Sequence, residues 1–158
     1  MRIEIKADMS SFKKYINENL IPVFNAVVLT PESKRKLSGV FPGIHSKKFI
    51  HHVTLQFRPD DFPADLGQEV EIHVTGYASD ENADAVSVTL NGTTSTNEFP
   101  HITISTTSDT KPVYSNELLE RSKQNGTLQN LKRPIILKGV VSSFIPKYGY
   151  ITKIPNEL

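Results

Sequence analysis

The sequence predicts an α+β protein built mainly from antiparallel sheet, with a few short helices. Several short stretches alternate apolar and polar residues, a pattern typical of half-buried strands. Turn-forming residues such as Asn91-Gly92 separate these stretches, and only short windows carry helix-capping residues. The chain has 158 residues, about the length of one domain, and contains no repeat or clear linker. We therefore expect a single domain over residues 1–158.

Local sequence patterns predict the secondary structure of about the first forty residues. Residues 3–6 alternate like a short strand, and residues 12–19 form a short polar helix candidate. Residues 22–29 are rich in β-branched side chains and predict a buried strand. Thr30 is a good N-cap, and the proline after it is favoured at the first helical position. A helix is therefore expected from Pro31 to about residue 38, ending near Gly39.

The rest of the chain is predicted to form mostly strands. Residues 69–78 alternate most clearly, with Val70, Ile72 and Val74 on one face. One further helix is expected, capped by Ser115 and running to about residue 124. The remaining predicted strands cover residues 49–57, 85–90, 99–105, 135–144 and 148–154.

Composition narrows the possible functions. The formal net charge of +1 argues against a large non-specific nucleic-acid surface, although a small anionic ligand needs only a local positive field. The chain has no cysteine, which excludes a thiolate nucleophile and cysteine-based metal sites. Its apolar runs are far shorter than the roughly 20 residues that span a bilayer, and we see no signal peptide. We expect a cytoplasmic protein without a membrane anchor.

Two predicted strands share the pattern apolar–His–x–Thr–apolar. The first contains His52 and Thr54, and the second contains His101 and Thr103. Residues two apart in a strand point to the same face. Each strand should therefore place an imidazole beside a hydroxyl on its polar face.

The same alternation extends to the neighbouring residues. We expect Gln56 on the face of His52, and Ser105 on the face of His101. Phe57 should lie on the opposite, apolar face together with Val53 and Leu55.

Two imidazoles and two hydroxyls suit the cleavage of a phosphodiester. One neutral histidine takes a proton from the attacking group, and the other, protonated, gives a proton to the leaving oxygen. Thr54 and Thr103 can donate hydrogen bonds to the phosphate oxygens as charge develops there. This chemistry requires no metal and no other cofactor. The sequence leaves open whether His52 or His101 is the base.

The paired motifs His52-Val53-Thr54 and His101-Ile102-Thr103 resemble the two signatures of the 2H phosphoesterase superfamily. That superfamily includes LigT-like RNA 2′,3′-cyclic phosphodiesterases, the cyclic phosphodiesterase domains of fungal tRNA ligases, 2′,5′-oligoadenylate-degrading enzymes and phage proteins that destroy cyclic-dinucleotide signals. The resemblance implies a two-lobed α+β fold with approximate twofold symmetry. Each lobe would supply one motif to a shared central cleft.

A third His–x–Thr sequence is present at His73 and Thr75. Gly76 follows the threonine where the other two motifs have an apolar residue. The short spacing between His73 and His101 leaves little room for a complete lobe. We therefore pair His52 with His101 and interpret His73 as an outward-facing strand residue.

Three further side chains are candidates for substrate binding. Arg58 follows the first motif strand and can contact a phosphate. Lys111 and Tyr114 follow the second motif, and a tyrosine can stack on a nucleobase.

The sequence thus predicts a metal-independent phosphodiesterase acting on a cyclic or 2′-linked nucleotide. The low net charge favours a small cyclic nucleotide signal, as for a phage anti-defence enzyme. The alternatives are an RNA end with a 2′,3′-cyclic phosphate and a non-catalytic nucleotide-binding module. No stable protein partner is implied. A zinc site built from His51, His52, His73 and His101 is disfavoured, because adjacent strand residues such as His51 and His52 should face opposite ways.

Overall fold

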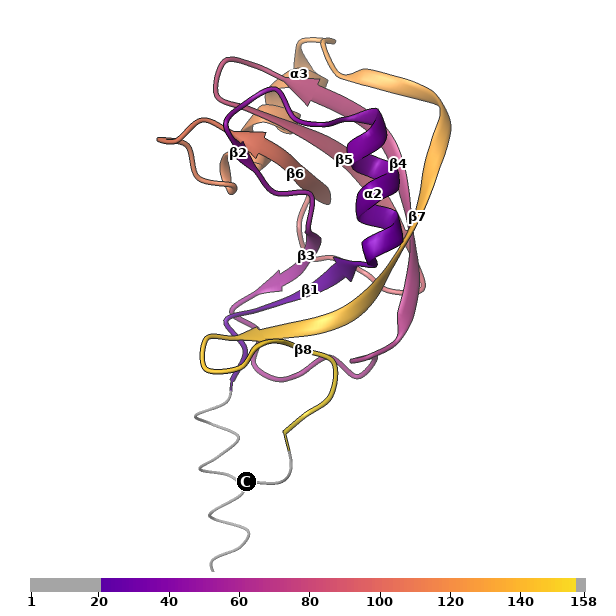
Figure 1. The fold of residues 1–158 in the computed structure, drawn as a ribbon, viewed down its shortest axis with the longest axis vertical. Coiled ribbons are helices and arrows are strands. Elements are labelled where there is room, and N and C mark those ends of the chain that lie inside the picture. Colours follow the sequence, from indigo (N-terminus) through magenta and orange to yellow (C-terminus); the bar gives the residue numbers. More distant parts are fainter. Residues whose placement is uncertain (1–20, 156–158) are drawn as a thin grey trace, which may run out of the picture.

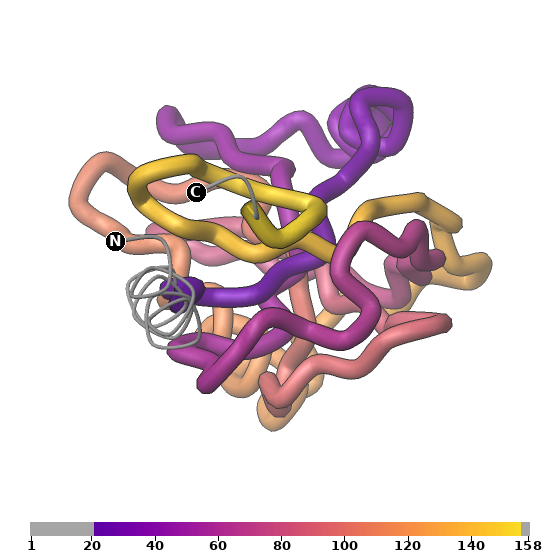
Figure 2. Tube along the Cα trace, turned by 90° about the horizontal axis from the view of Figure 1, so that it is seen from below, coloured from indigo at the N-terminus to yellow at the C-terminus, as the bar shows by residue number. Residues whose placement is uncertain are grey.

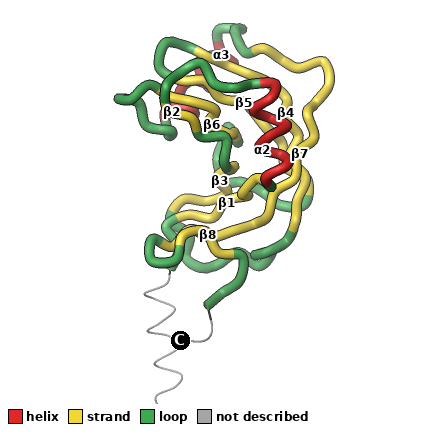
Figure 3. The backbone as a smooth tube through the Cα atoms, viewed as in Figure 1, coloured by secondary structure: helices red, strands yellow, loops and turns green. Residues whose placement is uncertain are grey.

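One curved antiparallel sheet forms most of the molecule (Figure 1). The structure, a computed structural model, describes residues 21–155. The expected strand at residues 3–6 and helix at residues 12–19 lie outside this range. The α+β class is confirmed, since two short helices accompany the strands (Figure 3). The strands are β1 (Phe24–Leu29), β2 (Lys47–Lys48), β3 (His52–Phe57), β4 (Glu69–Ser79), β5 (Ala83–Asn91), β6 (His101–Thr106), β7 (Gln129–Ile145) and β8 (Gly149–Ile151).

The order of strands places β3 at one end of the sheet and β6 near the other. The described sheet runs β2-β6-β5-β4-β7-β1-β3, with β8 paired to β7. The β7–β8 hairpin, yellow in Figure 2, lies beside the segment that leads into β1, where the amide of Val23 donates to the Phe144 carbonyl. Two halves result, one formed by β1, β3 and β7 and the other by β4, β5 and β6.

A single stretch of chain joins the two ends of the sheet. Residues 47 and 48 pair with β6, and the amides of Phe49 and Ile50 donate to the carbonyls of Ile104 and Thr103. From His52 onward the same stretch pairs with β1 instead. The backbone turns at Ile50, whose φ of 49° is a left-handed conformation that β-branched residues rarely adopt. The curvature of the sheet and this stretch together bring β3 next to β6.

Helix α2 (Pro31–Val40) covers the half that contains β1 and β7. The Thr30 hydroxyl accepts a hydrogen bond from the Ser33 amide at 3.2 Å, which confirms the predicted cap. Leu37 is fully buried on the face toward the sheet. The helix continues through Gly39 to Val40, slightly further than expected.

Helix α3 (Tyr114–Gln124) covers the half that contains β4 and β5. Leu118 and Leu119 pack against small residues of those strands, which allow the helix to approach closely. Ser115 was expected to cap this helix, but it lies inside the first turn and makes no capping bond. Its hydroxyl instead shares a hydrogen bond of 2.8 Å with the buried Thr103 hydroxyl. The need to satisfy a buried hydroxyl thus outweighs the local capping preference.

Strand β7 links the two halves, because it pairs with β1 on one side and β4 on the other. It is longer than the predicted strand at residues 135–144 and begins at Gln129. The extra residues include Pro134, which a regular central strand does not tolerate. Proline is tolerated here because the pairing of β7 with β4 is irregular. The partners of β4 pass directly from Ile135 to Asn130, and Pro134 lies between them.

The apolar core lies between the sheet and the helices. Val70, Ile72 and Val74 of β4 are buried together, as their alternation predicts. The main cluster also contains buried residues of β1, β3, β5, β6 and β7. Neither described helix is long and apolar enough to cross a bilayer.

Candidate active site

The two His–x–Thr motifs line one cleft of about 800 Å³ where the ends of the sheet meet. His52 and Thr54 come from β3, and His101 and Thr103 come from β6. The structure therefore brings together the four residues that the sequence pairs. The other lining residues are Phe24, Phe49, His51, Phe57, Asn97, Pro112, Val113, Asn116 and Tyr150.

Each motif strand carries an irregularity directly after its threonine. In β3 the pairing with β1 passes from Thr54 to Gln56, so Leu55 is an extra residue. In β6 the pairing with β5 passes from Thr103 to Ser105, so Ile104 is an extra residue. Such β-bulges reverse the alternation of faces beyond them. The two halves of the site thus share a local geometry as well as a sequence motif.

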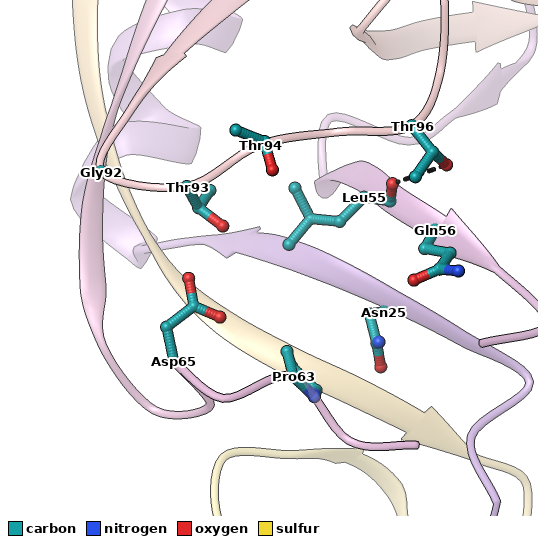
Figure 4. A pocket seen from close by; sticks show the side chains of 9 residues that line it. All are labelled: Asn25, Leu55, Gln56, Pro63, Asp65, Gly92, Thr93, Thr94 and Thr96. Atoms are coloured by element: carbon teal, nitrogen blue, oxygen red, sulfur yellow. Dashed lines mark hydrogen bonds between the residues drawn. The ribbon is translucent and has the colours of Figure 1, made fainter. Parts of the chain in front are cut away.

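The bulges overturn three predictions that assumed regular alternation of faces. Gln56 does not share the face of His52 but lines a second hollow on the opposite face of β1 and β3, about 550 Å³ in volume (Figure 4). Ser105 does not share the face of His101, because it is fully buried and its hydroxyl donates to Asp84 at 2.5 Å. Phe57, expected on the apolar side, lines the cleft and is 62% exposed.

The bulge in β3 is stabilised by hydrogen bonds from the loop after β5. The carbonyl of Leu55 accepts hydrogen bonds from the Thr96 amide at 2.8 Å and the Thr96 hydroxyl at 3.1 Å (Figure 4). The Ser95 hydroxyl donates to the Thr54 carbonyl at 2.9 Å. The loop after β5 therefore satisfies carbonyls around the bulge and keeps Phe57 turned into the cleft.

The imidazole of His101 has a fixed orientation. Its Nδ1 lies 2.7 Å from the carbonyl oxygen of Phe99, and a carbonyl only accepts, so Nδ1 carries the proton. Burial lowers the pKa of His101, and the hydrogen bond to Phe99 opposes this by stabilising the charged ring.

The imidazole of His52 is the more strongly perturbed of the two. Burial, followed by the charges of His51, His101 and Lys34, lowers the pKa of His52 to about 4. The ring is therefore neutral at neutral pH. Phe24 stacks against it, with ring centroids 5.5 Å apart.

The expectation that His51 points away from His52 is wrong. Both rings line the cleft, and their Nδ1 atoms lie 3.0 Å apart. Strict alternation fails because β3 begins only at His52, directly after the left-handed backbone at Ile50. The described residues contain no cluster of three or more histidine or carboxylate side chains spaced to hold a metal ion.

The remaining candidate site residues lie in several different parts of the molecule. His73 of the third motif is on β4, outside the cleft lining, and its Nε2 is 2.6 Å from a Glu71 carboxylate oxygen. Arg58 follows β3 and holds its guanidinium over the Phe57 ring, 5.5 Å from the centroid. Lys111 and Tyr114 line a separate hollow beside α3, where the Tyr114 hydroxyl donates to Asp80 at 2.5 Å. The lining of the cleft includes none of the three predicted substrate-binding residues Arg58, Lys111 and Tyr114.

The walls of the cleft are mainly apolar and aromatic, and sequence reasoning missed most of them. Phe24, Phe49 and Tyr150 come from separate segments, and no motif connects them. Among the described lining residues none carries a carboxylate. The cleft therefore suits an anionic group bound next to a flat apolar one.

Comparison with known protein families identifies the family of this chain. Residues 27–144 match the family described as the fungal tRNA ligase phosphodiesterase domain. The chain belongs to this family. The match runs from β1 into β7 and includes both motifs of the cleft. The family is part of the 2H phosphoesterase superfamily, so the predicted resemblance is confirmed and the protein is a 2H-type phosphodiesterase. No curated protein sequence matches the chain closely enough to count as a relative.

Proposed function

We propose that this phosphodiesterase opens a 2′,3′-cyclic phosphate at the end of an RNA chain. The description of the family names a tRNA ligase, which favours the RNA-end alternative over a small cyclic nucleotide signal or a phage anti-defence role. The observation that carries the proposal is the meeting of two His–Thr pairs in one cleft whose lining lacks carboxylates.

The reaction is a hydrolysis at phosphorus. The oxygen of a water molecule attacks the phosphorus atom, and the bond from phosphorus to one ribose oxygen breaks. One histidine accepts the proton that the water loses, and the other supplies the proton that the leaving ribose oxygen takes up. The product is a phosphomonoester beside a free ribose hydroxyl. Thr54 and Thr103 donate hydrogen bonds to the non-bridging oxygens, where negative charge develops.

The roles of the two histidines follow from their surroundings. His52 is the base, because its strongly lowered pKa keeps the ring unprotonated. We assign His101 as the acid. Burial lowers its pKa, but the Phe99 carbonyl accepts from Nδ1–H and opposes that shift by stabilising the protonated ring, so that Nε2–H can be donated.

The apolar wall gives a nucleobase a place beside the phosphate. Aromatic side chains stack on bases of any sequence, at roughly 1–3 kcal/mol for each base. Phe57 presents an exposed ring at the cleft, and Arg58 beside it offers a guanidinium to a neighbouring phosphate.

The test is a substrate panel in the presence of EDTA. Short RNAs ending in a 2′,3′-cyclic phosphate, cyclic dinucleotides and 2′,5′-oligoadenylates are incubated with the protein, and products are followed by mass. We expect turnover of the RNA ends, loss of activity in His52→Ala and His101→Ala, and retention in the control His73→Ala. Turnover of cyclic dinucleotides alone would refute the RNA-end assignment. Thermal stabilisation by nucleotides without turnover would support a binding module instead.

A further inference from the structure

The Nδ1 atoms of the two motif histidines have different kinds of hydrogen-bond partner. His101 directs its Nδ1 to a backbone carbonyl. His52 directs its Nδ1 to the Nδ1 of His51, 3.0 Å away, with the two rings nearly perpendicular at 81°. Only one hydrogen fits between two nitrogens at this distance, so one ring donates and the other accepts.

The backbone explains why two consecutive histidines meet. At Ile50 the chain leaves its pairing with β6, and the carbonyl of His51 then accepts a hydrogen bond from the Leu29 amide. The left-handed φ of Ile50 directs the next residue toward the cleft before regular alternation begins at His52.

The surroundings favour a neutral His51. Burial, followed by the charge of Lys34, lowers the pKa of His51. The Tyr150 ring lies 4.8 Å from the His51 ring, and its hydroxyl lies 3.5 Å from the His52 Nδ1. A neutral imidazole can offer an unprotonated Nδ1 to a neighbouring N–H.

We propose that His51 is a positioning residue whose Nδ1 accepts the Nδ1–H of His52. The bond holds His52 in the tautomer that leaves Nε2 without a proton, as a base requires. The same bond persists when Nε2 of His52 takes up a proton, because Nδ1–H then donates from a charged ring. This role rests on the proposed function of His52 as the base.

The first test is spectroscopic and needs no substrate. Nitrogen-15 shifts distinguish the two tautomers of a neutral imidazole, and a His52→Gln variant assigns the His52 signals. We expect His52 to carry its proton on Nδ1 in the native protein at pH about 8, above the ordinary histidine pKa. In His51→Phe, which keeps a ring beside Tyr150 but removes the acceptor, the proton should move toward Nε2. A native His52 protonated on Nε2, or the same tautomer in both proteins, would overturn the proposal.

The second test is kinetic and uses the RNA substrate. We expect His51→Phe to lower kcat about ten- to a hundredfold, the size of effect seen when the hydrogen-bond partner of a metal-ligating histidine is lost, with little change in KM. His51→Asn offers an amide oxygen as acceptor and should recover part of the rate. His73→Phe is the matched control and should keep the native kcat. Melting temperatures identify any variant that fails to fold, and equal kcat for folded His51→Phe and native protein would contradict the role.

The two tests separate the two proposals. If the tautomer shifts as expected but RNA ends are not turned over, the substrate assignment fails and the positioning role of His51 stands. If RNA ends are turned over but the tautomer does not respond to the loss of His51, the positioning role fails alone.

Discussion

At the residue scale, the chemistry depends on what surrounds each imidazole. Both rings are buried enough for their pKa values to fall below the ordinary value, and His52 falls further. His101 keeps a carbonyl partner that favours its charged form, whereas burial and then the charges of His51, His101 and Lys34 disfavour a charged His52. Two similar motifs therefore acquire different protonation behaviour from their neighbours.

These pKa values predict an acid-shifted pH profile. With His52 as the proposed base and His101 as the proposed acid, we expect the rate to fall when His52 becomes protonated, near its pKa of about 4, and again when His101 loses its proton. Because the pKa of His101 also lies below the ordinary value, the bell-shaped profile of kcat/KM should have its maximum below about pH 6.5. Measurement of kcat/KM between acid and alkaline pH checks this, and a maximum well above neutrality would contradict it.

The same burial makes stability depend on pH. The unfolded chain takes up a proton at His52 near the ordinary histidine pKa, and the folded chain does so only near pH 4. Between these values the unfolded state binds more protons, so the free energy of unfolding decreases as the pH is lowered, by up to about 3 kcal/mol. Urea unfolding at pH 7 and pH 5 measures the decrease. His52→Gln should show a smaller decrease than the native protein.

Arg58 combines a strained backbone with an exposed side chain. Its φ of 51° is unfavourable for an ordinary residue, and asparagine tolerates this conformation better. Arg58→Asn should therefore raise the free energy of unfolding by up to about 1 kcal/mol while raising KM for the RNA substrate. Arg58→Lys keeps the charge and the strain and serves as the control. An unchanged KM in Arg58→Asn would remove Arg58 from the substrate site.

At the element scale, the two bulges decide which side chains reach the cleft. Sequence alternation predicted most strands and both described helices, and it placed His52, Thr54, His101 and Thr103 on polar faces. It misplaced Gln56 and Phe57, because a bulge depends on hydrogen bonds from a distant loop that no local pattern records. The ends of β7 were missed for a similar reason, since the proline there is tolerated only by irregular pairing.

Thr96, in the loop after β5, should therefore affect the site although it does not line the cleft. Thr96→Val removes the hydroxyl that donates to the Leu55 carbonyl and should loosen the bulge. We expect a several-fold lower kcat/KM, because Thr54 and Phe57 lose their fixed positions, with a loss of stability of about 1 kcal/mol. Thr94→Val, an exposed position in the same loop, is the control. Equal kcat/KM in both variants would show that the bulge does not depend on this bond.

At the scale of the whole molecule, β7 joins the two halves of the sheet, so we expect them to unfold together. Gly139 lies where β7 pairs with β1 and β4 at once. A Cβ there would lie 2.8 Å from the Val28 carbonyl oxygen. Gly139→Ala should lower the free energy of unfolding by about 1–3 kcal/mol in a single urea transition. Gly39→Ala, an open position in α2, should instead be neutral or slightly stabilising.

The global arrangement was predicted only through the resemblance. Two motifs in strands do not by themselves reveal that one strand lies at one end of the sheet and the other lies near the opposite end, or that the sheet curves to bring them together. The aromatic wall was not predictable either, because Phe24, Phe49 and Tyr150 meet only in the folded chain.

The continuous stretch from β2 to β3 also has a consequence for dynamics. It is hydrogen-bonded to β6 and then to β1, so the two halves cannot separate without breaking backbone bonds at Phe49 and Ile50. We therefore expect ligand to enter without a domain closure on the microsecond-to-millisecond scale. Entry should instead depend on rotamer changes of exposed rings such as Phe57, on the picosecond-to-nanosecond scale. Association should then be limited by diffusion and orientation, and not by a slow conformational step.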